Sequence, residues 1–549
     1  MNDGRRIDEA SSVKQRDPEP RARTSRRRLL GAGALLAAWP ALAATRAEAG
    51  SDAGTGTGNH DGRGRSAMTA GDSERLGELT AVEAVRAMRQ GELTAEAYAG
   101  ALLDRCAQWQ HLNAFITLVP SQVLEAARAA DRLRASGAPL GALHGLPIPV
   151  KDSVNTKDYP TTAGTNALRA FRPAEDAAAV AQLRAAGAIV LGKTNLHELS
   201  FGWTSDNQAF GAVRNPYDPA RIPGGSTGGT AAAIAARMAP LGIAEDTQGS
   251  IRVPAALCGI CGFRPTMGRY STAGAAPITP VFDQVGPHAR SVDDLALFDA
   301  VLTGDARPLP NAALAGVRLG IPRAQYLDGV DAEVAAVTAA VLERLREAGV
   351  VFVEVDLPEV PGLVGRITGP LQLHDVLPSL ARYLRESGAP VDLAGLLAQV
   401  SPDVLGVLAR FSVEGAPEAV PEAAYAAARD VHRPALQRLF ADCFARHGIA
   451  ALVFPTTMVP ATPIGAAETV MIDGVAVPFM TAIARNIAPG STAGLPGLVL
   501  PGGLTPRTRL PVGIELDGPA GSDRALLALG RAITAVLAPM PAPALMRPS

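Results

Sequence analysis

Helical patterns that run directly into strand patterns recur along most of this chain, and they constrain its fold more than any other feature. A capping box, T-A-V-E, opens the helical pattern over residues 80–91. The helical pattern over 176–187 leads into the apolar run 188–191, and the amphipathic pattern over 331–349 leads into the strand pattern 350–355. Strands that alternate with helices in this way are buried between helical layers, so the sequence predicts an α/β fold.

The same alternation continues toward the C-terminus. Residues 291–302 form a predicted helix, residues 450–454 and 511–516 are predicted buried strands, and residues 522–538 form a predicted closing helix. Residues 361–434 are mostly helical in pattern but contain several prolines, which predicts a less regular cover over one face of the fold.

The first 49 residues predict an export signal. Residues 25–30 read SRRRLL, which has the twin-arginine form, and an Ala/Leu-rich apolar stretch covers 29–44. That stretch is too short to span a bilayer, and small residues suited to cleavage stand at 41–43 and 47–49. We therefore expect a twin-arginine signal peptide over residues 1–49 and an exported, periplasmic or secreted protein.

Residues 50–72 are rich in Gly, Asp, Ser and Thr and lack apolar periodicity, so they predict a disordered linker. One catalytic domain is then expected from residue 73 to residue 549. The net charge of -2 and the aromatic content of 4% give no basis for binding nucleic acid. We expect no stable membrane insertion once the signal is removed, and the sequence does not specify an oligomeric state.

Cysteine and histidine are placed too sparsely to predict a metal or redox site. Cys258 and Cys261 are the one close pair among four cysteines, and neither a second pair nor a thioredoxin-like pattern accompanies them. We expect them to be small buried apolar side chains. His197-Glu198 is not followed by a second histidine at ligand spacing. No metal and no cofactor are predicted.

The most informative stretch covers residues 223–265. It begins PGGSTGGTAAA and predicts a Gly-rich loop, a small-residue helix, a strand, a second loop that ends at Ser250, and an apolar helix. Two loops on either side of one helix can converge, because glycine permits close approach of the backbone. A phosphate-binding loop is not favoured, since no lysine follows the glycines and no strand precedes them.

Residues 224–228, GGSTG, also match the GxSxG pattern, which would make Ser226 the nucleophile of a Ser-His-Asp esterase. That arrangement requires a strand that runs into the serine, whereas the preceding residues are proline-rich and predict a loop. The downstream histidines stand singly in ordinary surroundings: His288, His374, His432 and His447. The esterase remains the alternative of a different class.

Lys151 ends the apolar segment LPIPVK, which predicts a buried approach and a partly desolvated amine. Desolvation lowers a lysine pKa from its usual value of about 10.4 toward the range that suits a general base. An isolated lysine is far more often a solvated surface residue, so this interpretation depends on the loops that accompany it.

Three segments together resemble the signature of the amidase signature family: HGLPIPVKDS around Lys151, GGSTGG, and DTQGSIRVPA around Ser250. The similarity extends over most of the body, including GKTNLHE at 192–198, GPHARS at 286–291 and LPVG at 510–513. The resemblance implies the family's fold, a large mixed β-sheet core surrounded by α-helices.

The resemblance also implies the roles of individual residues. Lys151 is the base, Ser226 the bridging serine, and Ser250 the nucleophile that carries the acyl-enzyme. A cis peptide bond is expected after Gly225. The oxyanion hole is expected to consist of backbone N–H groups, those of Thr247, Gln248 and Gly249.

Three further side chains are expected to support this machinery: Thr227, Asp246 and Arg252. Thr227 replaces a serine that is common in the family and keeps its hydroxyl group. Asp246 and Arg252 flank the loop, and they either pair to hold it or are unrelated solvated charges. Gln248 replaces a common glycine, so a bulky polar side chain stands where it can restrict the loop or reach the acyl pocket.

The resemblance therefore implies an amidase that hydrolyses carboxylic amides to an acid plus ammonia or an amine. Residues 259–270 and 277–291 are most similar to hydrolases of arylacetamides, so small or aryl-substituted amides are the expected substrates. A peptide amidase, an aryl acylamidase or a carbamate hydrolase of the same family remains an alternative. Export argues against the family's tRNA-dependent amidotransferases, which work in the cytoplasm with partner subunits.

Overall fold

The computed structural model describes residues 70–544 except residues 414, 466 and 467. The predicted signal peptide and nearly all of the predicted linker lie outside the described residues. The first helix, α1 (Ala70–Gly77), begins a few residues before the predicted start of the catalytic domain at residue 73.

A mixed sheet of 11 strands forms the centre of the described structure, in the order β1-β3-β2-β4-β6-β5-β12-β13-β9-β7-β8, and β10 and β11 form a separate hairpin. The strands are β1 (Phe115–Thr117), β2 (Pro147–Lys151), β3 (Ile189–Thr194), β4 (Leu241–Asp246), β5 (Cys261–Arg264), β6 (Gln284–Ala289), β7 (Arg318–Ile321), β8 (Val351–Glu354), β9 (Ala451–Pro455), β10 (Thr469–Ile472), β11 (Val475–Pro478), β12 (Gly497–Leu504) and β13 (Pro511–Asp517).

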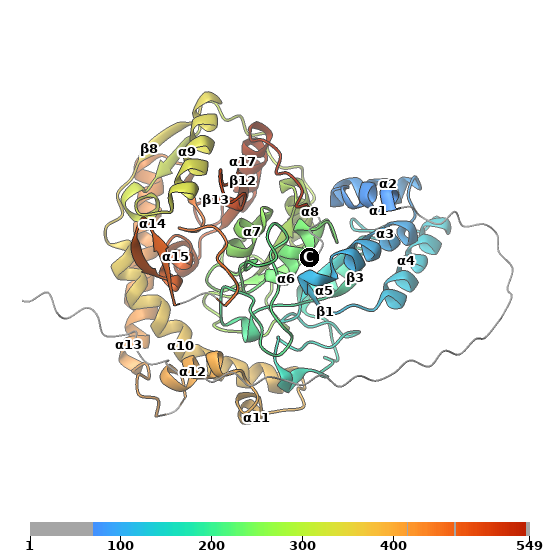
Figure 1. The fold of residues 1–549 in the computed structure, drawn as a ribbon, viewed down its shortest axis with the longest axis horizontal. Coiled ribbons are helices and arrows are strands. Elements are labelled where there is room, and N and C mark those ends of the chain that lie inside the picture. Colours follow the sequence, from blue (N-terminus) through green and yellow to red (C-terminus); the bar gives the residue numbers. More distant parts are fainter. Residues whose placement is uncertain (1–69, 414, 466–467, 545–549) are drawn as a thin grey trace, which may run out of the picture. The chain divides into compact units, whose positions relative to one another are not determined.

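Helices surround this sheet, which confirms the predicted α/β class (Figure 1). After α1 they are α2 (Ala81–Gln90), α3 (Ala95–Gln108), α4 (Pro120–Ala135), α5 (Ala178–Ala185), α6 (Gly228–Ala235), α7 (Arg252–Cys258), α8 (Val292–Thr303), α9 (Ala332–Glu347), α10 (Val360–Glu386), α11 (Leu393–Leu397), α12 (Pro402–Phe411), α13 (Glu422–Ala427), α14 (Arg433–His447), α15 (Phe479–Ala484), α16 (Ala488–Ala493) and α17 (Asp523–Val536). Short 3₁₀ or π turns are η1 (Gln110–Leu112), η2 (Asn166–Leu168), η3 (Glu198–Ser200), η4 (Arg323–Leu327) and η5 (Ala428–His432).

The order of the strands brings three segments that are distant in sequence to one edge of the sheet. β2 lies between β3 and β4 and runs parallel to both. Parallel strands direct their carboxyl ends to the same edge, so Lys151 at the end of β2 lies beside the last residues of β4. β6 runs antiparallel to β4 and pairs Gln284 with Asp246, which brings the residues before β6 to this edge as well.

Two prolines stand in β2 although it is an interior strand. Proline has no backbone N–H, so it cannot donate to the ladder. The register between β2 and β3 shifts between Ile148 and Pro149, and β2 pairs with β4 at Val150 and Ile243. All residues of β2 are nevertheless buried. Apolar packing therefore stabilises this strand although it forms fewer backbone hydrogen bonds with its neighbours.

Helices α6 and α7 lie in the middle of the fold and are buried along their whole lengths (Figure 1). α6 packs against β2, β4 and β6, and α7 packs against β5, β12 and β13. The small residues of α6 allow this close approach, because a Cβ on Gly229 would lie 2.4 Å from the carbonyl oxygen of Asn195. The loops that precede the two helices, 223–227 and 247–251, are therefore anchored in the core.

Residues 361–434 differ from the expected irregular cover. α10 continues without a break for 27 residues and contains Pro370 and Pro378. Proline removes one intrahelical hydrogen bond and normally kinks or ends a helix. Here α10 buries Leu363, Ile367 and Leu371 against the core formed with α14, and this packing sustains the helix through its prolines.

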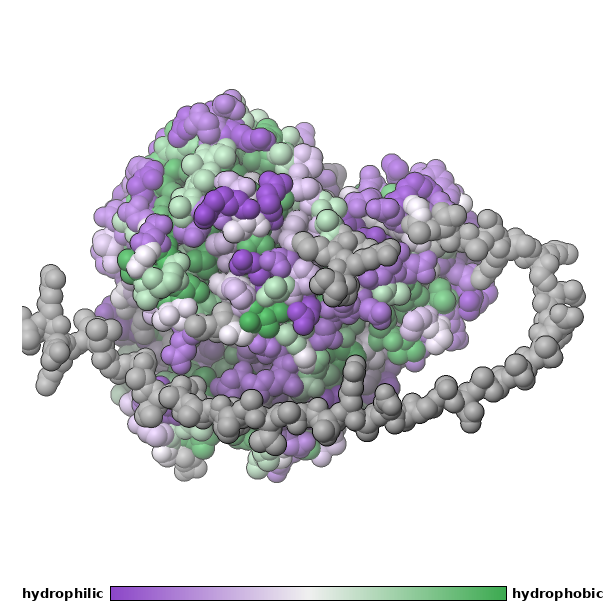
Figure 2. Space-filling model, in the orientation of Figure 1, coloured by the Kyte–Doolittle hydropathy of each residue, from purple (hydrophilic) through white to green (hydrophobic). Residues whose placement is uncertain are grey.

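The surface of the described residues is mixed. Figure 2 shows hydrophilic residues over much of one face, with smaller apolar areas between them. Large exposed apolar side chains include Met471 and Val475 on the β10–β11 hairpin and Met480 on α15. None of the described helices combines the length and the apolar character needed to cross a membrane.

Candidate active site

Lys151 is the centre of a buried polar cluster at the carboxyl end of β2. Its side chain has no exposed surface. Nζ lies 2.7 Å from Oγ of Ser226 and 2.7 Å from Oε2 of Glu245. Burial lowers the pKa of Lys151, and the negative charge of Glu245 opposes this shift. The sequence predicted partial desolvation of this amine, and the structure buries it completely.

The two Gly-rich loops converge as the sequence predicted. The Gly225–Ser226 peptide bond is cis, as the family resemblance implies. Gly224 has a positive φ of 85°, and a Cβ there would lie 2.8 Å from Cα of Pro254 in α7. Oγ1 of Thr227 donates to the backbone oxygen of Glu245 (3.0 Å). The loop that carries Ser226 therefore packs directly on β4 and α7, which flank the second loop.

Ser250 lies in the turn between β4 and α7 and is 4% exposed. Of the two contacts that the predicted proton relay requires, the hydrogen bond from Lys151 to Ser226 is present. Among the described residues, the hydroxyl groups of Ser226 and Ser250 do not form a hydrogen bond. Catalytic hydrogen bonds of this kind commonly tighten only when the substrate binds.

Asp246 holds the loop that ends at Ser250. Its carboxylate accepts from the backbone N–H groups of Gly249 (2.7 Å) and Ile251 (3.0 Å). It also forms ion pairs with Arg252 (3.2 Å) and Arg264 (2.8 Å), and all three charged side chains are fully buried. Burial raises the pKa of Asp246, but the two guanidinium groups outweigh it and hold that pKa well below its usual range. Asp246 and Arg252 are thus a buried pair, the first of the two sequence alternatives.

One predicted oxyanion donor requires correction. The backbone N–H of Gly249 points at Oδ1 of Asp246, so it is already used within the loop and is not available to a substrate oxygen. The N–H groups of Thr247 and Gln248 donate to no described group. The sequence could not reveal this difference, because only the path of the loop decides which N–H groups turn inward toward Asp246.

Gln248 lies beside these free donors and is 5% exposed. Its Nε2 lies 3.5 Å from Oγ1 of Thr492 in α16, and its backbone oxygen accepts from Nε1 of Trp203 (2.9 Å). Its side-chain oxygen, Oε1, is buried and has no protein partner among the described residues. Gln248 therefore connects the loop to α16 and leaves one polar atom unpaired.

Several charged and polar residues of the cluster were not predicted from the sequence. Glu245 carries hydrogen bonds from Lys151, Ser200 (3.0 Å) and Thr247 (3.1 Å). Oδ1 of Asp283, just before β6, lies 2.7 Å from Oγ1 of Thr247. The sequence contains one indication that Glu245 has a polar partner, because an acidic residue near the end of an otherwise apolar, buried strand needs one. No sequence pattern predicts that Asp283 lies in this cluster, because its position depends on the pairing of β6 with β4.

The histidines and cysteines among residues 70–544 do not form a catalytic arrangement. Nε2 of the buried His288 lies 2.7 Å from the backbone oxygen of Ile251, and burial lowers the pKa of His288 to about 4. In the described part of the chain, no histidine ring hydrogen-bonds to the hydroxyl group of Ser226, whose partner is Lys151, so the Ser-His-Asp esterase is not favoured. Cys258 and Cys261 are buried free thiols, as expected. The described residues contain no group of three or more His, Cys, Asp or Glu suited to a metal ion.

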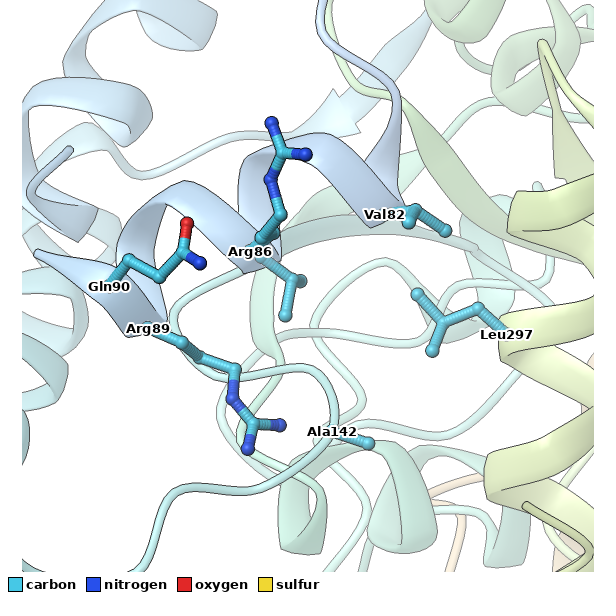
Figure 3. A pocket seen from close by; sticks show the side chains of 7 residues that line it. Val82, Arg86, Arg89, Gln90, Ala142 and Leu297 are labelled. Carbon is cyan, nitrogen blue, oxygen red and sulfur yellow. The ribbon is translucent and has the colours of Figure 1, made fainter. Parts of the chain in front are cut away.

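A separate surface pocket of about 310 Å³ lies between α2, α8 and the segment before β2 (Figure 3). Its lining residues are Val82, Val85, Arg86, Arg89, Gln90, Ala142 and Leu297. None of them belongs to the cluster around Lys151, so the pocket is not part of this site.

The sequence of the chain matches a family model described as Amidase over residues 98–527. It is 36% identical to the indoleacetamide hydrolase of Allorhizobium ampelinum over 82% of this chain and 96% of that protein. It is 37% identical to the mandelamide hydrolase of Pseudomonas putida over 86% of this chain and 94% of that protein.

Solved structures of amidases share the fold. An amidase crystal structure aligns with a TM-score of 0.75 at 32% identity, covering 84% of this chain and all 100% of that chain. The peptide amidase of Stenotrophomonas maltophilia aligns with a TM-score of 0.72 at 30% identity, covering 85% of this chain and 99% of that one.

We predict that Asp246→Asn lowers the free energy of unfolding by about 3 to 5 kcal/mol, because it leaves Arg252 and Arg264 buried without their shared counter-charge. Chemical denaturation at pH 7 measures this loss. The pKa of Asp246 is lower in the folded state than the usual value of about 3.9, so its stabilisation is present above that pH and declines as the pH falls further. The difference in the free energy of unfolding between the wild-type protein and the variant should therefore become smaller at acidic pH.

Asp305→Asn is the matched control, because Asp305 pairs with the exposed Arg307 at the surface. It should leave the denaturation midpoint unchanged. Equal effects of the two substitutions would contradict the role assigned to Asp246.

Proposed function

This chain belongs to the amidase signature family and hydrolyses carboxylic amides, and on this premise we propose that Ser250 is its nucleophile, with Lys151 and Ser226 as the proton-transfer pair. The observation that carries this proposal is the 2.7 Å contact between Nζ of Lys151 and Oγ of Ser226 in a site without solvent exposure. A serine hydroxyl becomes an effective nucleophile only when a neighbour takes its proton.

In the proposed first step, Oγ of Ser250 attacks the carbonyl carbon of the amide. Its proton passes to Oγ of Ser226, and the proton of Ser226 passes to the uncharged amine of Lys151, which becomes an ammonium group. The free N–H groups of Thr247 and Gln248 stabilise the negative oxygen of the tetrahedral intermediate, and each such donor contributes about 3 to 4 kcal/mol.

In the second step, the proton returns from Lys151 through Ser226 to the amide nitrogen, the C–N bond breaks, and ammonia or an amine leaves. An acyl ester on Ser250 remains. Water then attacks this ester and gives its proton to the Ser226–Lys151 pair. The pair passes that proton to Oγ of Ser250 as the ester C–O bond breaks and the carboxylic acid leaves. Apart from the substrate and this water molecule, each step uses side chains and backbone groups of this chain.

We expect Lys151→Ala and Ser250→Ala each to lower kcat/KM for amide hydrolysis by about three orders of magnitude or more, because each removes a group that reacts in the first step. Ser226→Ala should have a comparable effect. Steady-state release of ammonia measures the rates. Labelling of the wild-type protein with a fluorophosphonate probe should modify Ser250.

His432→Ala and His447→Ala are the controls, since both side chains lie outside the cluster around Lys151. They should retain wild-type rates. Normal activity of folded Lys151→Ala protein, or labelling of Ser226 in place of Ser250, would refute the proposed mechanism.

The substrates are proposed to be small aryl-substituted amides, in particular arylacetamides. Two half-buried aromatic residues are near these loops in sequence or by contact: Phe201 follows Ser200, which donates to Glu245, and Nε1 of Trp203 donates to the backbone oxygen of Gln248. Aromatic side chains beside a site favour aromatic ligands. The names of the similar indoleacetamide and mandelamide hydrolases support the same substrate class. The similarity to a peptide amidase supports peptide C-terminal amides as the second candidate.

A panel of amides separates these candidates. Release of ammonia from indoleacetamide and mandelamide should proceed with a kcat/KM at least about 10-fold above that for aliphatic amides, as expected when one aromatic ring is additionally buried. Peptide amides should be poorer substrates than either arylacetamide. A preference for peptide amides, anilides or carbamates would assign the chain to the corresponding alternative.

We also propose that the protein is exported through its twin-arginine signal and acts in the periplasm or outside the cell. The support is the sequence alone: the SRRRLL motif, the short apolar stretch after it, and the small residues that follow.

Replacement of Arg26 and Arg27 by lysine should retain the protein in the cytoplasm, because the paired arginines are what the export machinery recognises in such signals. Cell fractionation with an amidase assay measures this. Removal of residues 1–49 should also block export yet leave an active enzyme. Unchanged export of the double-lysine variant would contradict the proposal.

A further inference from the structure

Among the described residues, Glu245 is the one carboxylate that contacts the amine of the proposed base, Lys151. Both partners of the 2.7 Å contact are almost completely buried, with side-chain exposures of 0% for Lys151 and 2% for Glu245. The carboxylate is itself held in place, because Ser200 donates to Oε2 and Thr247 donates to Oε1. Glu245 therefore has a defined position from which it orients Nζ.

We propose that Glu245 is a positioning residue for amide hydrolysis, which holds Nζ of Lys151 against Ser226 and stabilises the ammonium group formed during the attack of Ser250. This inference rests on the proposed function of Lys151 as the base. Nζ has an acceptor on one side, Glu245, and the bridging hydroxyl on the other. When the amine is uncharged, one of its hydrogens bonds to Glu245, which turns the lone pair toward the hydroxyl of Ser226.

The charge of Glu245 has two opposite consequences. It favours the ammonium form of Lys151, so more of the base is protonated and inactive at low pH. It also lowers the energy of the transition state, in which positive charge develops on Nζ. The carboxylate of a Ser-His-Asp triad acts on its histidine in the same two ways.

The hydroxyl group of Thr247 connects Glu245 to a second buried carboxyl group, that of Asp283. Oγ1 of Thr247 lies between Glu245 (3.1 Å) and Asp283 (2.7 Å), but a hydroxyl group has only one hydrogen to donate. Both contacts are satisfied when Asp283 carries a proton on Oδ1 and donates to Thr247, which then donates to Glu245. Burial and the charge of Glu245 raise the pKa of Asp283 to about 7, in agreement with this arrangement.

The other titratable groups near Lys151 are themselves paired or neutral. Asp246 is neutralised by Arg252 and Arg264, and His288 is uncharged. On the neighbouring strand β3, Lys193 forms its own ion pair with Asp152 (3.1 Å). Glu245 is thus the charged group that most directly sets the protonation of Lys151.

The test is the pH profile of Glu245→Gln, measured as kcat/KM for amide hydrolysis and as the rate of fluorophosphonate labelling of Ser250. The acid limb of both profiles should move to lower pH by about 1 to 3 pH units, because loss of the carboxylate lowers the pKa of Lys151. The plateau at high pH should fall by about 10- to 100-fold, because the ammonium group is no longer stabilised. The labelling rate requires no knowledge of the physiological substrate.

Two further variants complete the test. Glu245→Asp keeps the negative charge but places it one methylene group farther from Lys151. The acid limb of its pH profile should therefore lie between those of the wild type and Glu245→Gln. It also serves if Glu245→Gln does not fold. Asp299→Asn is the matched control, since it neutralises an equally buried carboxylate of α8, one that pairs with Arg269 and does not contact Lys151. Its acid limb should coincide with that of the wild type.

A uniform loss of rate at every pH, with an unmoved acid limb, would overturn the inference and leave Glu245 with a structural role only. That outcome differs from failure of the proposed function, in which Lys151→Ala or Ser250→Ala would remain active.

Discussion

The buried contact between Lys151 and Glu245 is the interaction on which the site depends. A lysine and a glutamate removed from water are each costly to bury alone, and they are tolerated because they face each other at 2.7 Å with hydrogen bonds on the remaining atoms. Burial lowers the pKa of Lys151 and so favours its uncharged amine, whereas a surface lysine is protonated near neutral pH. The same contact keeps that amine aimed at Ser226.

The nearby carboxylate of Asp246 also acts on the charge of Lys151, but it has partners of its own. Asp246 is bound by two arginines and by two backbone N–H groups of the loop that ends at Ser250. These contacts shape the loop before any substrate arrives, which is the kind of preorganisation that stabilises developing charge at little further cost. One of these contacts occupies the N–H of Gly249, so this group is not available as a predicted donor to the substrate oxygen.

Topology explains how residues so far apart in sequence meet. Lys151 and Glu245 lie at the carboxyl ends of neighbouring parallel strands, whereas Asp283 immediately precedes β6, which runs the opposite way. The helix between the two loops, α6, is made of small residues and sits directly on these strands. A larger side chain at Gly229 would meet the backbone of Asn195, so the short residues of α6 are a condition for the convergence of the loops.

The amino-acid sequence alone determined the α/β class and the starts of several helices, and its motifs predicted three reacting side chains, because hydrophobic periodicity, capping residues and local motifs are properties of short segments. It also placed Gln248 beside the oxyanion loop. Tertiary structure decided the rest: the continuation of α10 through two prolines, the pairing of Asp246 with two arginines, the use of Gly249 within the loop, and the partnership of Lys151 with Glu245. These features depend on which strands become neighbours and which N–H groups turn inward. Such long-range contacts produce no periodic pattern in the sequence.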